Sequence, residues 1–188
     1  MEFNYDLLDD LLTVQREFDA RITTKRLGDT TLAYFVELFE WLNSKELFKN
    51  WKASPGKGLD VELDELADVL AFALSLIGQG LDAIEDEEEV ALEYIVAEVN
   101  EGLAKITDGF TLDKSEITLY YIRLLLNAVF EDEQPSLTLD SLAFLLAQPF
   151  VIAEVYYNTD ALIEAYKAKM ARNHARQDGT ADEDRGYV

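Results

Sequence analysis

The amino-acid sequence predicts an all-α protein that folds as a helical bundle. Only three prolines and nine glycines interrupt a chain of 188 residues. The apolar residues recur at steps of three and four rather than in strict alternation, which is typical of amphipathic helices. Hydrophobic residues make up 49% of the chain and charged residues 29%, as in globular domains. At this length we expect one domain that buries roughly 70% of the surface exposed by the unfolded chain.

Turn and capping signals separate the first three expected helices. Helix one has an apolar stripe that includes Leu8, Leu11 and Leu12, and the turn at 28–31 supplies the N-cap of helix two. A loop rich in glycine and proline follows at 54–58, after which Asp60 is expected to cap helix three. These three helices are predicted over residues 6–22, 32–49 and 60–77.

The second half of the chain predicts four more helices. The acidic run at 82–89 suits a solvated first turn beside the positive end of a helix dipole. The polar segment at 131–136 breaks the chain, and Pro149 suits the first turn of the last helix. The four helices are predicted over residues 85–106, 113–130, 138–147 and 149–171.

From Arg172 onward the sequence is polar and lacks an apolar period, which predicts a mobile tail. We therefore expect a single all-α domain over residues 1–171 and a polar C-terminal tail over 172–188. No apolar stretch reaches the eighteen or so residues of a membrane span, and the first residues lack a basic signal region. The absence of cysteine excludes disulfides and thiolate metal sites. A cytoplasmic protein without membrane contact is the expectation.

The net charge of −22 bears on the class of partner. Nucleic-acid backbones are bound by Lys and Arg side chains that neutralise phosphates, so we expect no nucleic-acid partner. An acidic chain is compatible with the binding of metal cations, although solvated helix faces also account for most of this charge.

Two pairs of acids stand out because their surroundings are apolar. Glu37 and Glu40 interrupt the apolar run from Leu32 to Leu42, and Glu65 and Asp68 repeat the three-residue step on the next expected helix. Such a step places both carboxylates on one helix face, about 5–6 Å apart at Cβ. Carboxylates in apolar surroundings are costly unless they are paired with a cation.

Two antiparallel helices could therefore present four carboxylates to a pair of metal ions. Oxygen ligands without His or Cys favour Mg²⁺, for which Mn²⁺ can substitute, over zinc or iron. The alternative is that the acids lie on the wet faces of amphipathic helices.

Magnesium sites of this kind usually leave positions open for substrate phosphates. The basic residues form two groups that could supply counter-charges for a triphosphate. These groups are Lys45, Lys49 and Lys52, and Lys167, Lys169, Arg172 and Arg176. The chain has no P-loop, no Rossmann fingerprint and no G-x-S-x-G motif, which leaves metal-activated water as the nucleophile.

Several segments resemble the dimeric, all-α dUTPase family, which belongs to the MazG-like nucleoside triphosphate pyrophosphohydrolases of kinetoplastids, bacteria and phages. The segments are the acid-bearing stretches 32–52 and 65–72, the N-terminal stretch Leu11-Leu-Thr-Val-Gln15, and the C-terminal stretch from Tyr166 to Gln177. The resemblance implies a helical bundle with a four-helix catalytic core, of the phage or bacterial type. It is thin between residues 80 and 136.

The resemblance also implies roles for individual residues. Glu37, Glu40, Glu65 and Asp68 would coordinate Mg²⁺, with Glu37 and Glu40 as the catalytic acids. Gln15 would hydrogen-bond uracil with Trp51 packing nearby, Lys169 and Arg176 would contact phosphates, and Asn173 would contact the deoxyribose hydroxyl. The family's tail continues Gln-x-x-Gly-Tyr, whereas here Gly186-Tyr187 is displaced from Gln177, so Gln177, Arg185 and Tyr187 receive no role.

The implied activity is that of a dUTP diphosphatase. Mg²⁺-activated water would attack the α-phosphorus of dUTP with help from Glu37 or Glu40, releasing pyrophosphate and dUMP. The polar tail would close as a lid. Two alternatives stay open: a related pyrophosphohydrolase acting on another nucleotide such as dCTP, and a non-catalytic helical interaction module. The family implies a homodimer, for which the aromatic segments 119–126 and 150–157 offer apolar surface.

Overall fold

The chain folds into an all-α bundle, as the sequence predicts, in a computed structural model that describes residues 3–82, 87–106, 111–131, 134–135 and 137–180. The helices within these ranges are α1 (Tyr5–Asp19), α2 (Leu27–Lys45), α3 (Leu59–Leu81), α4 (Glu88–Ala104), α5 (Ser115–Val129), α6 (Leu139–Tyr156) and α7 (Thr159–Gln177). Two strands of two residues each, β1 (Phe130–Glu131) and β2 (Gln134–Pro135), pair antiparallel where the sequence predicts only a break.

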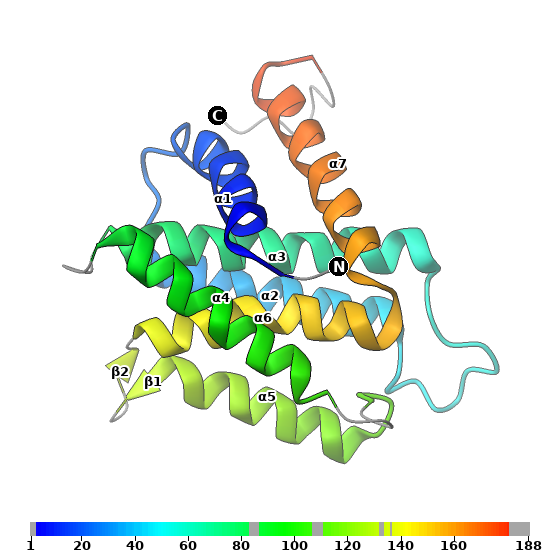
Figure 1. The fold of residues 1–188 in the computed structure, drawn as a ribbon. Coiled ribbons are helices and arrows are strands. Elements are labelled where there is room, and N and C mark those ends of the chain that lie inside the picture. Colours follow the sequence, from blue (N-terminus) through cyan, green and yellow to red (C-terminus); the bar gives the residue numbers. More distant parts are fainter. Residues whose placement is uncertain (1–2, 83–86, 107–110, 132–133, 136, 181–188) are drawn as a thin grey trace.

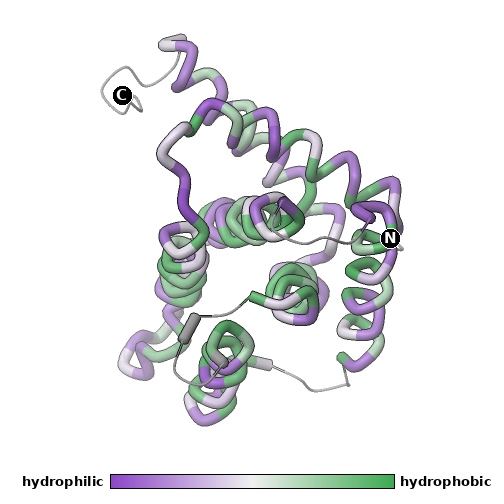
Figure 2. The backbone as a smooth tube through the Cα atoms, turned by 90° about the vertical axis from the view of Figure 1, so that its left-hand side faces the viewer, coloured by the Kyte–Doolittle hydropathy of each residue, from purple (hydrophilic) through white to green (hydrophobic). Residues whose placement is uncertain are grey.

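Helix α3 is the centre of the bundle. It packs against α1, α2, α6 and α7, while α4 and α5 pack on α6. In Figure 1, α1 and α7 lie on one side of α3, and α5 lies on the opposite side of the molecule. The helices that run across Figure 1 are seen end-on in Figure 2, where they surround a common interior. The central position of α3 explains its long apolar stretch, because most residues from Leu66 to Ile77 are buried.

Several helix boundaries differ from the predicted ones. Helix α2 begins at Leu27, so Gly28 and the residues after it form a first turn rather than a separate turn. Helix α3 is capped by Gly58 and not by Asp60. Gly58 has a φ of 116°, a conformation that is easy only for glycine, and this explains why the cap lies there.

The prediction that Pro149 begins the last helix is wrong, because Pro149 lies inside α6. Proline cannot donate the backbone hydrogen bond that residue 149 would give to the carbonyl of Leu145. That carbonyl accepts a bond of 3.1 Å from the buried Tyr34 hydroxyl on α2 instead. The helix therefore continues to Tyr156, and the true break is at Asn158, whose side chain caps α7.

Helix α6 is also long and apolar enough to cross a membrane by length and composition alone, contrary to the expectation from the sequence. More than half of the helix, 56%, is buried among the other helices. Its apolar composition is accounted for by its place inside the bundle.

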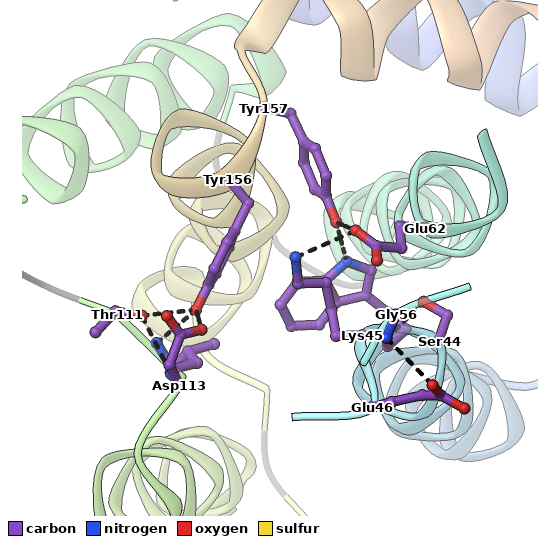
Figure 3. Close-up of polar contacts among 11 residues, drawn as sticks. Ser44, Lys45, Glu46, Gly56, Glu62, Thr111, Asp113, Tyr156 and Tyr157 are labelled. Carbon is purple, nitrogen blue, oxygen red and sulfur yellow. Dashed lines mark hydrogen bonds and ion pairs between the residues drawn. The ribbon is translucent and has the colours of Figure 1, made fainter. Parts of the chain in front are cut away.

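The loop between α2 and α3 is held by a group of partly buried polar contacts, and Figure 3 shows the one between Gly56 and Glu46. Glu46 has a left-handed φ of 54° and accepts hydrogen bonds from the Gly56 backbone and from the Lys49 and Lys52 ammonium groups. These lysines lower the pKa of Glu46 to about 2. These contacts hold the loop that connects the two acid-bearing helices, α2 and α3.

A second part of this group lies at the start of α3. Glu62 accepts hydrogen bonds from Tyr157 at 2.8 Å and from Lys45 at 3.2 Å. The Tyr157 hydroxyl in turn lies 3.2 Å from the Trp41 ring nitrogen, which donates to it. The lysines at 45, 49 and 52 thus pair with Glu62 and Glu46, and they do not line the cavity described below.

Candidate active site

Three of the four predicted metal-binding acids come together between α2 and α3. Glu37 lies on α2, and Glu65 and Asp68 lie one turn apart on α3. One carboxylate oxygen from each lies within 4.8 Å of the others, so one cation could contact all three. Oxygen-only donors of this kind suit a hard divalent cation such as Mg²⁺.

Burial and mutual repulsion raise the pKa values of these acids. Burial, followed by the charges of Asp68 and Glu40, raises the pKa of Glu37 to about 7. Burial chiefly raises the pKa of Asp68 to about 6, against the opposing effect of Lys169. The pKa of Glu65 is also raised, first by burial and then by Glu40. The ionised acids are therefore destabilised by burial and by their mutual repulsion, and a bound cation would offset both effects.

Glu40 lies apart from this triad. It is exposed on α2, although it is close enough to raise the pKa values of Glu37 and Glu65. The structure therefore gathers Glu37, Glu65 and Asp68 and leaves Glu40 at the edge, where its role as a ligand stays a prediction.

A lysine from the last helix enters the acid cluster. The Lys169 ammonium on α7 contacts Asp68 and donates a hydrogen bond of 2.8 Å to Asp64, which also contacts Arg172. Burial lowers the pKa of Lys169, but the Asp68 and Asp64 carboxylates outweigh it, and the pKa is raised. Asp64 was not among the residues singled out in the sequence, although it lies four residues before Asp68 and so on the same face of α3.

A cavity of about 490 Å³ opens beside the acids, between α1, α2, α3 and α7. Its size is within the usual range for small-molecule sites. Six of the nine residues singled out in the sequence line it: Gln15, Glu37, Asp68, Lys169, Asn173 and Arg176. Residues from both ends of the chain thus meet in one place, next to the acid cluster.

The wall formed by α1 contains a buried polar chain. The Gln15 side-chain amide donates a hydrogen bond of 2.8 Å to Asp19, and the Tyr166 hydroxyl lies 3.2 Å from the Gln15 amide oxygen. Asp19 also accepts a bond of 2.6 Å from Ser75 and forms an ion pair with Lys25 at 3.3 Å. Asp19 too was not predicted from the sequence, although its four-residue spacing from Gln15 places both on one face of α1.

The wall formed by α7 differs from the prediction of a tail that starts at Arg172. Helix α7 continues to Gln177, so Asn173 and Arg176 are held on a helix, and Asn173 is buried. The Arg176 guanidinium donates to the Asn173 side-chain oxygen at 3.3 Å. Arg185 and Tyr187 lie outside the described residues.

Trp51 is not brought to this cavity. It lies in the loop between α2 and α3 with 73% of its surface exposed, and its ring contacts that of Phe48. The packing of Trp51 beside the base therefore stays a prediction.

Taken together, the fold and the site are those of an all-α protein that gathers carboxylates from neighbouring helices beside a polar cavity. The sequence model of a family described as dUTPase matches residues 7–180. The chain therefore belongs to the dimeric, all-α dUTPase family, whose members act as hydrolases on nucleotides and generally use a divalent metal. No curated protein matches the chain.

Proposed function

We propose that this protein is a dUTP diphosphatase that hydrolyses dUTP to dUMP and pyrophosphate with Mg²⁺. The observation that carries the proposal is the cavity between α1, α2, α3 and α7. It joins the acid cluster to Gln15 at one wall and to Lys169, Asn173 and Arg176 at another. Family membership supports this type of activity, and it gives no support to a non-catalytic interaction module.

The acid cluster has the donors that a hard divalent cation requires. Glu37, Glu65 and Asp68 would hold Mg²⁺, with Glu40 joining from the edge of the cluster. A divalent cation held there would lower the pKa of water and offset charge on the phosphates. Glu37 or Glu40 would accept the proton of the attacking water.

Basic and polar groups at the cavity suit the rest of the nucleotide. Lys169 and Arg176 can contact phosphate oxygens by charge-assisted hydrogen bonds, and Asn173 between them can contact a sugar hydroxyl. Gln15 is buried at the wall formed by α1 and offers both a donor and an acceptor to a base. This arrangement supports binding of the triphosphate near α7 and of uracil near α1.

The test is hydrolysis of dUTP, dCTP, dTTP and UTP, each with Mg²⁺ and with EDTA. We expect pyrophosphate release from dUTP alone at a high rate, and none in EDTA. The variant Glu65→Gln should lose turnover while retaining the thermal midpoint of the parent protein. Glu93→Gln, an exposed change on α4, is the matched control and should retain full activity.

Preferential hydrolysis of dCTP would instead establish the related pyrophosphohydrolase alternative. Full dUTP turnover by the Glu65 variant, or in EDTA, would contradict the metal role of the cluster.

A homodimer is the second element of the proposal. Leu32, Val36 and Phe39 recur on one face of α2, and each is exposed. Phe39 and Leu119 of α5 also line an apolar groove of about 350 Å³. Exposed apolar surface of this kind marks protein interfaces. In the segment 150–157, Phe150, Ile152 and Ala153 are buried in the core, whereas its other apolar side chains are half-buried, so its part in a dimer stays a prediction.

The remaining proposals concern the chain as a whole. The polar C-terminal end of the chain is proposed to close over the substrate as a lid, as predicted from the sequence. A cytoplasmic location, with which a chain without cysteine is compatible, is also proposed. The oxygen donors of the acid cluster are also proposed to bind Mn²⁺. A metal titration of the EDTA-treated protein would compare Mn²⁺ with Mg²⁺.

A further inference from the structure

The orientation of the Gln15 amide is set by its neighbours. Its nitrogen lies 2.8 Å from an Asp19 carboxylate oxygen, and its oxygen lies 3.2 Å from the Tyr166 hydroxyl. A carboxylate only accepts hydrogen bonds, so it must face the NH₂ end of the amide. The hydroxyl can satisfy the amide oxygen by donating to it. The hydroxyl also lies 3.3 Å from the Leu11 carbonyl, which competes for its one proton, so the Asp19 carboxylate is the contact that decides the orientation of the amide.

Asp19 is itself held firmly. It is only 6% exposed, and its second oxygen accepts from Ser75 of α3 at 2.6 Å and pairs with Lys25 at 3.3 Å. The Gln79 amide lies 3.2 Å from the Ser75 hydroxyl and continues the chain of contacts. Three donors therefore converge on two carboxylate oxygens, and the carboxylate that orients Gln15 has little freedom to turn.

We propose that Asp19, assisted by Tyr166, is a positioning residue that fixes the Gln15 amide so that the cavity selects uracil over cytosine. The inference rests on the proposed function, in which Gln15 contacts the base. It adds that the selection depends on Asp19 and Tyr166, which act through their contacts with Gln15.

The two bases differ in the order of their donors and acceptors. Uracil presents an N3–H donor next to the O4 acceptor, whereas cytosine presents an N3 acceptor next to an amino donor. An amide in one fixed orientation can pair its oxygen with N3–H and its remaining N–H with O4. With cytosine in the same pose, donors would face donors and acceptors would face acceptors. An amide free to turn over could pair with either base, so selection requires that something hold it.

Asp19→Asn tests this directly, since asparagine keeps the shape but can present its own NH₂ group to Gln15. That group favours the reversed amide. We expect the ratio of kcat/KM for dUTP to that for dCTP to fall at least about tenfold, because mispaired polar groups dominate such discrimination. Tyr166→Phe removes only the hydroxyl and should shift the ratio in the same direction by less. Glu17→Gln, an exposed change on α1, should leave the ratio unchanged.

The possible outcomes separate the two proposals. A folded Asp19 variant that keeps the ratio within about twofold, or that loses both substrates equally, shows a structural role and overturns the inference alone. Should the Asp19 variant fail to melt cooperatively, the Tyr166 variant applies the same criterion from the other end of the amide. Wild-type protein that does not prefer dUTP to dCTP would overturn the proposed function and the inference together.

Discussion

Replacing Glu37 by glutamine should stabilise the metal-free protein at alkaline pH while it removes activity. The pKa of Glu37 is raised from 4.5 to about 7, chiefly by burial and then by the Asp68 charge. The folded state therefore disfavours the ionised side chain. The resulting loss of stability is absent below the unfolded-state pKa of 4.5, and it develops fully as the pH rises through about 7. Glutamine has a similar shape and carries no charge, so it avoids this loss.

The size of the effect follows from the two pKa values. The difference between 4.5 and about 7 corresponds to about 3 kcal/mol, at roughly 1.4 kcal/mol for each pH unit. Glu37 is only partly buried, and solvent screening reduces the expected gain to about 1–2 kcal/mol. Gains of this size are typical when a site built for function is relieved of strain.

Urea denaturation in EDTA measures the gain. At about pH 8 the Glu37→Gln variant should unfold at a higher urea concentration than the parent, and at about pH 5 most of the difference should disappear. Adding Mg²⁺ at the higher pH should stabilise the parent more than the variant, because binding to the folded state adds to its stability. A variant that is equally or less stable at about pH 8 in EDTA would refute the electrostatic reasoning. The exposed Glu93→Gln change serves as control at both pH values.

Three further changes test the packing of the helices and the proposed dimer interface. Gly80→Ala would place a Cβ 2.4 Å from a Leu142 methyl group, so we expect a loss of about 1–3 kcal/mol, and no change in the urea midpoint would contradict this close contact. Tyr34→Phe should cost about 1–3 kcal/mol, because the buried Leu145 carbonyl loses its hydrogen-bond donor. In a Pro149→Ala background the backbone N–H of residue 149 can donate to that carbonyl, so the cost of Tyr34→Phe should be smaller. Equal costs in the two backgrounds would disprove the compensation. Phe39→Asp should convert the proposed dimer to a monomer in light scattering, and a monomeric parent protein would exclude that interface.

The local fold could be predicted to the extent that it depends on neighbouring residues. Apolar spacing indicated each of the described helices, and the loop at 54–58 was placed correctly by its glycines and proline. The error at Pro149 arose because proline at an internal position normally leaves a carbonyl unpaired. A hydroxyl more than a hundred residues away, on Tyr34, satisfies that carbonyl, and no local pattern contains this information.

The candidate site shows the same division. The acids at 37, 65 and 68 could be found because a carboxylate within an apolar run is costly unless a cation pairs with it. Asp19 could not be distinguished from the other acids of α1 until the packing of α3 brought Ser75 against it. Lys49 and Lys52 were misread for a related reason, since Glu46 pairs with both only after a left-handed turn of the backbone.

Lys169 connects these observations, because it lies where the acid cluster meets the cavity. Its ammonium contacts Asp68 and Asp64, and the same side chain lines the space proposed for the triphosphate. In the metal-free protein its charge lowers the pKa values of Glu37 and Asp68, but burial outweighs it and both remain raised. The same ammonium cannot fully neutralise the acids and also bind a phosphate. A divalent cation at the acids would therefore free Lys169 for the substrate, which ties phosphate binding by α7 to metal binding by α2 and α3.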